Sequence, residues 1–324
     1  MQKPPLAREP SSFSPRWPEN GVSVIVRFHD ASRLPLLREA LASLAAQEHA
    51  SVQAIVVIQN GNDDLTRAIQ AHLTQAFPQA EPHRVLNLPI PTGEDGRSRL
   101  LNAGLQVAQG RYLAFLDYDD IVYPRAYATL IQRLQESRCA VAVGGCILVQ
   151  RNPDGTLNEN FRRPYTDRQQ NKLDLMAHNF IPIHSFLMDR SLLAPSFDLR
   201  FRPDLNRFED YELLLRLAAH YDFDFENWNI PVAEYRLHTD GSNTIPTKNS
   251  SLEQKLEWER AQDVIDQLKK NLRISVSALD AQTLVNERDQ LLRERGSLPF
   301  RAAAQVLKRR RKIQSFLATW KQKP

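Results

Sequence analysis

Three carboxylates stand close together near the middle of the chain, where they could bind a cation. Asp117, Asp119 and Asp120 fall within four positions, directly after the apolar run 112–116. Carboxylates this close repel one another unless a cation or a set of hydrogen-bond donors compensates their charge. A divalent ion on oxygen ligands is the simplest compensation. The alternative is that Asp120 caps the next helix and that the other two are solvated loop acids.

A second pair of acids, Glu209 and Asp210, opens a segment whose apolar residues have helical spacing. The helix dipole stabilises acids in the first turn of a helix, so a structural role alone would account for them. A carboxylate within reach of a hydroxyl group can also take up its proton during a reaction. His238 follows the last predicted strand, where it could bind a metal or be an ordinary loop residue.

A regular alternation of strands and helices is predicted around the first group of acids. The strands are 22–26, 54–58, 85–88 and 112–116, and the helices between them are 34–47, 63–76 and 96–108. Such alternation predicts an α/β fold with a mainly parallel sheet covered by helices on both faces. Ligands bind at the carboxyl ends of the strands in such a sheet, which is where Asp117 would lie. Neither a G-x-G-x-x-G fingerprint nor a P-loop follows the first strand.

The remaining elements alternate less regularly. We predict helices at 124–135, at 173–176 and from residue 209 onwards, and strands at 140–150, 157–162, 181–188 and 231–237. The composition changes near residue 249, after which two helical stripes of apolar residues follow. The sequence therefore predicts a disordered segment 1–20, one α/β domain over 21–249 and a helical, basic C-terminal extension over 250–324.

Charge is unevenly distributed along the 324 residues. The net charge is +4, but residues 301–324 carry eight Lys or Arg and no acid, so the body of the chain is net negative. A nucleic-acid ligand is therefore not expected in the main cleft. The basic stretch 298–324 has an apolar face with Trp320, which predicts either peripheral contact with an anionic membrane or packing on protein.

The expected location is the cytoplasm, either free or peripheral on the inner face of the plasma membrane. The two cysteines are too few for a disulfide framework and are expected to be reduced. Residues 1–21 lack the apolar core of a signal peptide. No apolar run approaches the ~20 residues of a membrane-spanning helix.

Several short motifs, in order along residues 20–245, resemble those of family 2 glycosyltransferases of the GT-A fold. The opening strand 22–26 and the helix ending 43–47 resemble the family's first βα unit. The matching motifs that follow are Asn102-Ala103-Gly104, Ala108-Gln109-Gly110-Arg111-Tyr112, the DXD-like Asp117-Tyr118-Asp119, the "ED" pair Glu209-Asp210, and Tyr235-Arg236-Leu237-His238. Each motif is weak alone, and their order and spacing carry the resemblance.

The resemblance implies transfer of a sugar from a nucleotide-diphosphate donor to a hydroxyl acceptor, with inversion at the anomeric carbon. Asp119 would bind Mn²⁺ or Mg²⁺, with Asp117 beside it and His238 as a further ligand. Asp210 would be the catalytic base, with Glu209 as the second candidate. The residues expected to contact the donor are Arg27, His29, Gln59, Asn60, Arg97, Arg99, Asp117 and Tyr118.

The sequence departs from the family pattern at three places. Gln59 and Asn60 stand where the family has an acidic pair that contacts the nucleotide base, so a UDP-sugar is the expected donor but its base is left open. Arg27 replaces a common proline. Leu101 replaces a common arginine, and Arg97 and Arg99 could take over its phosphate contact.

Two functions remain in competition at this point. The first is an active glycosyltransferase acting on a glycan or lipid-linked acceptor in surface polysaccharide or glycoconjugate synthesis. The second is a non-catalytic module that binds nucleotide sugars and is recruited through its basic helical tail. The amides at 59 and 60 favour the second, whereas the complete set of acids with His238 favours the first. Acceptor specificity is expected between residues 147 and 206.

Overall fold

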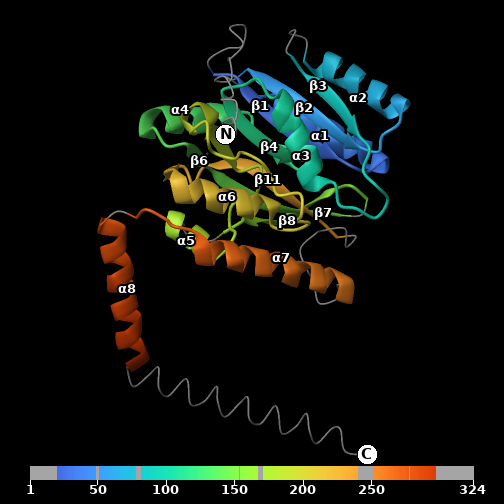
Figure 1. The fold of residues 1–324 in the computed structure, drawn as a ribbon. Coiled ribbons are helices and arrows are strands. Elements are labelled where there is room, and N and C mark those ends of the chain that lie inside the picture. The colour runs from blue at the N-terminus through green and yellow to red at the C-terminus, as the bar shows by residue number, and fades with distance from the viewer. Residues whose placement is uncertain are drawn as a thin grey trace, which may run out of the picture. The chain divides into compact units, whose positions relative to one another are not determined.

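The computed structural model describes residues 20–48, 51–77, 82–152, 154–166, 171–239, 251–276 and 278–296. Two sheets and their covering helices make up the fold (Figure 1). The strands are β1 (Val22–Phe28), β2 (Val52–Gln59), β3 (Arg84–Leu88), β4 (Tyr112–Asp117), β5 (Ile121–Val122), β6 (Val141–Val143), β7 (Gly145–Arg151), β8 (Leu157–Pro164), β9 (Phe186–Asp189), β10 (Phe223–Asp224) and β11 (Pro231–His238). The α-helices are α1 (Leu34–Ala45), α2 (Asp63–Ala76), α3 (Arg97–Val107), α4 (Ala126–Ser137), α5 (Lys172–Ala177), α6 (Glu209–His220), α7 (Leu252–Asn271) and α8 (Ala278–Gly296).

The larger sheet has the strand order β10-β6-β9-β4-β1-β2-β3. β1 pairs in parallel with β2 and β4, and β2 pairs in parallel with β3. β9 is the exception, because it runs antiparallel to both β4 and β6. The predicted mainly parallel α/β sheet is confirmed. Its parallel strands β1, β2, β3 and β4 end at the same edge. That edge carries Arg27, Gln59 and Asp117.

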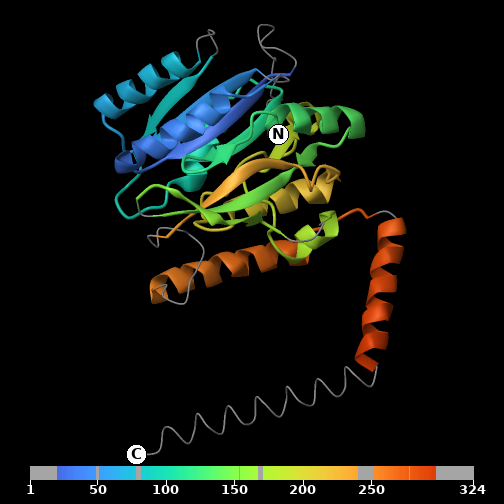
Figure 2. The same ribbon diagram turned by 180° about the vertical axis from the view of Figure 1, so that it is seen from behind.

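Helices cover both faces of this sheet because successive residues of a buried strand point to opposite sides. Val22, Val24 and Val26 pack in one apolar cluster together with α1, α2 and α4. Ile25 belongs to the cluster on the other face, which includes side chains of α3, α5 and α6. Figure 1 shows the face covered by α3 and α6, and Figure 2 shows the face covered by α1.

A second, four-stranded sheet has the order β5-β11-β7-β8. The sequence predicted one strand at 140–150, but the chain instead forms β6 in the larger sheet and β7 in the smaller one. Gly144 separates them, and a Cβ atom there would lie 2.5 Å from Val232 Cγ1. A side chain at this position would collide with β11, so a glycine allows the chain to pass between sheets.

The predicted strand 181–188 is also shorter in the structure. Only Phe186–Asp189 is extended, and residues 182–185 form a turn in which the amide of Ser185 donates to the carbonyl of Pro182 at 2.9 Å. Apolar residues alone cannot distinguish a buried turn from a buried strand. The turn places His184 in the interior, where it is 2% exposed.

The chain divides into two compact units, Met1–Arg273 and Ile274–Pro324. Helix α7 packs on the first unit: Ile265 is fully buried in the apolar cluster of α3 and α6. The sequence had assigned this helix to the extension beyond residue 249, because the composition changes near that residue. None of the described helices is long and apolar enough to cross a membrane. The segments 1–19 and 297–324, including the proposed membrane contact, lie outside the described residues.

Replacing Ile265 by Ala should destabilise the first unit, because it leaves a cavity in the apolar cluster that α7 shares with α3 and α6. We expect the free energy of unfolding in urea to fall by about 2–5 kcal/mol. Leu256→Ala on the same helix is the matched control, because Leu256 is 41% exposed. Its loss should stay below about 1 kcal/mol. Equal, small losses in both variants would show that α7 is not part of this unit.

Candidate active site

Arg27 joins the two groups of carboxylates at the edge of the larger sheet. Its Nε lies 2.6 Å from Asp117 Oδ1, and its Nη1 lies 2.5 Å from Glu209 Oε1. β1 and β4 are neighbours whose register places Arg27 beside Asp117, while Glu209 arrives from the start of α6. A guanidinium group is planar and has several N–H donors, so it can hold two carboxylates at once.

The charge of Arg27 keeps both acids ionised although they are buried. Burial raises the pKa of a carboxyl group, and it acts in this direction on both Asp117 and Glu209. Attraction to Arg27 outweighs burial, so that the pKa of each acid lies below its ordinary value. Their negative charges in turn hold the pKa of Arg27 well above its ordinary value despite burial.

Asp119 and His238 form a second contact, and both line the same cavity as Asp117. His238 Nε2 lies 3.2 Å from Asp119 Oδ2, and the two side chains are only 10% and 23% exposed respectively. Asp119 follows β4, and His238 is the last residue of β11. The structure therefore brings together two of the three predicted metal ligands. The third, Asp117, has both carboxylate oxygens within hydrogen-bond distance of Arg27.

Asp120 is a buried support for this pair and not a helix cap. Its Oδ1 accepts a hydrogen bond of 2.7 Å from the backbone amide of Arg236, and its Oδ2 lies 3.2 Å from His184 Nδ1. Helix α4 begins after Arg125 without any side-chain cap. The expectation that Asp120 caps this helix is therefore wrong. The contact ties the turn that carries Asp119 to the strand that carries His238.

The pair Asp119 and His238 suits a divalent ion that also binds a phosphate. Mg²⁺ commonly uses one or two carboxylates and takes its other ligands from substrate phosphates and water. Within the described parts of the chain, three or more His, Cys, Asp or Glu side chains do not come together as a metal site. These residues therefore fit an ion that takes further ligands from a diphosphate better than an ion bound by protein side chains alone.

A cavity of about 170 Å³ surrounds this pair. Five predicted donor-binding residues line it, namely Arg27, His29, Arg97, Asp117 and Tyr118. The ring of His29 packs edge-on against Tyr118 at 5.3 Å between centroids. Burial, followed by the charges of Arg97 and Arg27, lowers the pKa of His29, so its ring is neutral near pH 7.

The other three predicted donor-binding residues do not line this cavity. The amide of Asn60 exchanges hydrogen bonds of 2.7 and 2.8 Å with the backbone of Ile90, which fixes the loop after β3. Gln59 packs against Gly96 at the start of α3, where a Cβ would lie 2.6 Å from its Oε1. Arg99 is 44% exposed and forms an ion pair with Glu94.

A larger cleft of about 400 Å³ adjoins the first cavity, and Asp210 lies in its wall. Its carboxylate accepts a hydrogen bond from the amide of Tyr211 at 2.7 Å and lies 3.4 Å from Asn179 Nδ2. Burial and the neighbouring charge of Glu209 raise the pKa of Asp210 to about 7. Two adjacent acids thus have opposite shifts, because Arg27 pairs directly with only one of them.

The larger cleft also contains residues that were not predicted from the sequence. They are Tyr165, Asn179, Arg207, Trp258, Gln262 and Lys269. The last three come from α7, and their spacing of four and seven residues puts them on one helix face. In the sequence, the aromatic Trp258 within an otherwise polar stretch was the available signal for these residues. Only the packing of α7 shows which protein surface its Trp258 face contacts.

Replacing Arg27 by Met should leave Asp117 and Glu209 buried without their cation. We expect the free energy of unfolding at pH 7 to fall by about 3 kcal/mol or more. The difference from wild type should shrink as the pH falls through the ordinary carboxyl range. The unpaired acids of the variant take up protons first and lose their buried charge, and the paired acids of the wild type, whose pKa values are lowered, lose their attraction to Arg27 at still lower pH. Arg99→Met is the control, because its exposed ion pair should contribute less than about 1 kcal/mol. Equal losses in the two variants would contradict the bridging role.

Comparison with known proteins agrees with this architecture. TarS of S. aureus, crystallised in complex with UDP-GlcNAc, is similar in fold with a TM-score of 0.53 at 14% sequence identity, over 78% of this chain and 68% of that one. The uncharacterised glycosyltransferase YibD of Escherichia coli is 32% identical over 123 residues, which are 38% of this chain and 33% of YibD.

Two further relatives match longer segments. A β-1,3-glucosyltransferase of Campylobacter jejuni is 28% identical over 167 residues, half of each chain. The succinoglycan biosynthesis protein ExoO of Rhizobium meliloti is 30% identical over 190 residues, which are 56% of this chain and 51% of ExoO. The matches thus span from a third to about half of these curated relatives. The family model for glycosyl transferase family 2 matches residues 23–194. With its mainly parallel sheet and flanking helices of the GT-A type, the chain belongs to glycosyl transferase family 2.

Proposed function

We propose that this chain is a metal-dependent, inverting glycosyltransferase that moves a sugar from a nucleotide-diphosphate donor to a hydroxyl group of an acceptor. The observation that supports this most strongly is the junction of the two cavities. Arg27, Arg97, Asp117 and Tyr235 line both of them. A diphosphate beside Asp119 and a hydroxyl beside Asp210 would therefore be neighbours.

Each side of this junction has the chemistry that its half of the reaction needs. A divalent ion held by Asp119 and His238 would act as a Lewis acid that neutralises the charge growing on the departing diphosphate. Arg97, which lines the same cavity, can donate hydrogen bonds to phosphate oxygens. Gln59 and Asn60, whose side chains support loops, are weaker candidates for donor contact than His29 and Tyr118.

Asp210 is the proposed base. An acceptor hydroxyl attacks the anomeric carbon while the bond from that carbon to the diphosphate breaks, and the hydroxyl proton passes to the Asp210 carboxylate. Attack from the side opposite the diphosphate inverts the configuration. The raised pKa of about 7 gives Asp210 more basicity than an ordinary carboxylate has. Glu209, held by Arg27, stays ionised and supports the site without transferring a proton.

The proposed donor is a UDP-sugar, because UDP and UDP-GlcNAc bind to TarS, whose fold is similar. The proposed acceptor is a glycan or a lipid-linked sugar in the synthesis of a surface polysaccharide or glycoconjugate. ExoO and the Campylobacter enzyme, which belong to succinoglycan and undecaprenol-linked glycan synthesis by name, support this setting. Peripheral membrane contact through residues 298–324 remains part of the proposal.

Removing the proposed metal ligands should abolish metal-dependent nucleotide binding. This binding is measured by the thermal stabilisation that UDP gives with and without Mn²⁺. A ligand at a hundred times its Kd stabilises a protein by about 2.7 kcal/mol. We expect Asp119→Asn and His238→Ala each to lose most of the Mn²⁺-dependent stabilisation by UDP. Asp64→Asn is the control, because Asp64 is 86% exposed on α2. Unchanged Mn²⁺-dependent stabilisation in both site variants would rule out this metal site.

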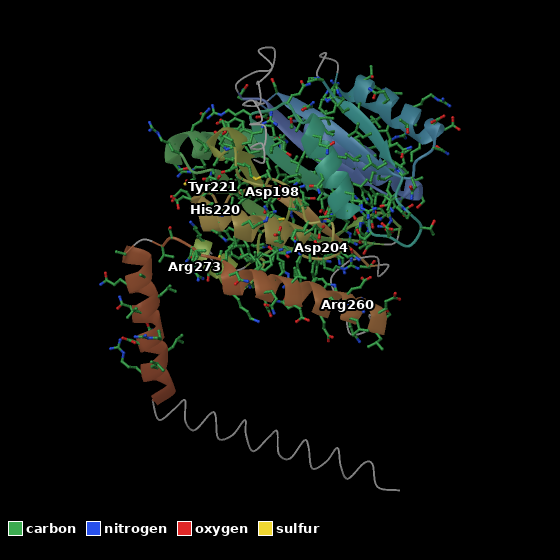
Figure 3. The ribbon with its side chains drawn as sticks, in the orientation of Figure 1. Asp198, Asp204, His220, Tyr221, Arg260 and Arg273 are labelled. Carbon is green, nitrogen blue, oxygen red and sulfur yellow. The ribbon has the colours of Figure 1, made fainter. Side chains whose placement is uncertain are left out.

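Replacing Asp210 by Asn should stop catalysis while donor binding is retained. We expect turnover of UDP-GlcNAc, measured as UDP release with a panel of glycoside acceptors, to fall by about 10²- to 10⁴-fold. In the wild type, kcat/KM should rise with pH through about 7, because the base must be deprotonated. Asp204→Asn, on the surface segment before α6 (Figure 3), should behave like wild type, since Asp204 is 56% exposed.

The same assay separates the enzyme from the non-catalytic alternative. Binding of UDP-GlcNAc and Mn²⁺ without UDP release in the wild type, across the whole acceptor panel, would favour a binding module. The engagement of Asn60 with Ile90 shows that an amide at this position has a structural use. The departure at position 60 therefore no longer favours the alternative.

A further inference from the structure

Helix α7 forms one wall of the cleft that contains Asp210. Trp258, Gln262 and Lys269 line this cleft together with Asp210, Tyr165 and Tyr211. All of α7 lies beyond residue 194, where the family match ends. The wall therefore lies outside the part of the chain that the family model matches, and its composition bears on what the cleft accepts.

The wall is fixed relative to the proposed base. The ring of Trp258 packs edge-to-face with Phe208, with 4.6 Å between centroids, and Phe208 directly precedes Glu209 and Asp210. Arg207 Nη2 lies 3.2 Å from Glu257 Oε2 on the same helix. Ile265, fully buried, anchors the middle of α7. A group bound against this wall would thus be held at a set distance from the Asp210 carboxylate.

Lys269 brings an incompletely compensated positive charge into the cleft. Its Nζ donates to the carbonyl of Ala177 at 3.3 Å and lies 5.0 Å from the centroid of the Tyr211 ring. Among the described residues, Lys269 forms no ion pair with a carboxylate within 4 Å, and the charge of Asp266 on the same helix only partly offsets the effect of burial, which lowers the pKa of Lys269. An ammonium group has three donors, and a partly buried one is stabilised by an anion.

Arg207 adds a second cation to the same wall. Its side chain is 12% exposed, and its Nε is buried without a hydrogen-bond partner in the described structure. Asp95 and Glu257 lie near its terminal nitrogens, at 3.6 and 3.2 Å. Arg207 is thus already paired with two carboxylates, whereas Lys269 has no carboxylate of the described residues within 4 Å. The positive charge of Lys269 therefore points to an anionic group on the molecule that enters the cleft.

We propose that α7 selects the acceptor, and that the cleft takes a sugar residue carrying a phosphate or carboxylate group, with its ring against Trp258 and its anion toward Lys269. This inference rests on the proposed function of the site. Aromatic side chains offer a large apolar surface to the C–H face of a sugar, and the amides of Asn179 and Gln262 can bond its hydroxyls. Acceptor specificity then lies largely beyond the segment 147–206 in which the sequence had placed it.

Ligand-observed NMR titrations of the full chain test the proposal. The probes are methyl glucoside, methyl glucuronide and glucose 6-phosphate, which are neutral, carboxylate-bearing and phosphate-bearing respectively. They are run with and without saturating UDP and Mg²⁺, so that the donor cavity is filled in one series. We expect at least one anionic sugar to bind about tenfold more tightly than the neutral one, as a charge-assisted hydrogen bond would provide.

Three variants assign that preference to α7. Lys269→Gln keeps an N–H donor for the Ala177 carbonyl but removes the charge, so the preference should fall to about twofold or less. Lys270→Gln, a neighbouring exposed lysine on the same helix, is the matched control and should retain it. Trp258→Ala should weaken all three sugars, and Trp258→Phe should restore part of that loss.

The outcomes separate this inference from the proposed function. UDP binding is measured first in every variant, and its absence in the wild type would contradict the donor site alone. Equal binding of neutral and anionic sugars, or no sugar binding at all, would overturn the acceptor proposal. So would a preference that Lys269→Gln leaves unchanged, because the anion would then bind elsewhere. Thermal unfolding of each variant shows whether a loss of binding reflects loss of folding.

Discussion

The bridge from Arg27 to Asp117 and Glu209 is the interaction on which the rest of the site depends. It joins the end of β1, the end of β4 and the first turn of α6, three elements far apart in the sequence. Two buried carboxylates without a cation would repel each other and raise each other's pKa. Arg27 resolves this conflict, and it also fixes where α6 begins and hence where Asp210 lies. Arg27, which stands where the family commonly has a proline, therefore departs from the family pattern and has a structural role of its own.

The same bridge gives two adjacent acids different pKa values and different roles. Glu209 pairs with the guanidinium and has a lowered pKa. Asp210, one residue on, instead contacts Asn179 and the amide of Tyr211 and has a pKa raised to about 7. A group that exchanges a proton near neutral pH needs such a shift. The motif alone left the choice of base between the two residues, and their surroundings favour Asp210. In this way a charge that stabilises the fold also sets the chemistry of its neighbour.

Much of the architecture could be predicted because strong periodic signals carry it. The runs 22–26, 54–58 and 112–116 are mostly apolar, and all lie in strands of the larger sheet. Predictions failed where an apolar run had more than one possible use. Residues 140–150 divide between two sheets at Gly144, and residues 182–185 turn inward, because long-range packing against β11 and β9 decides these paths. The stripe on α7 indicated a buried face, and its partner was visible only in the fold.

The sequence by itself determined the family, the mainly parallel sheet and the residue types at the strand ends, since these follow from local periodicity and ordered motifs. Only the tertiary structure decided how those residues pair. It paired Asp117 with Arg27, Asp119 with His238, and Asp120 with the amide of Arg236. It also engaged Asn60 and Arg99 in contacts outside the cavity. The physical reason is that pairing energies depend on the distance and burial of side chains, mostly from segments far apart in the sequence, and spacing along the chain does not encode these.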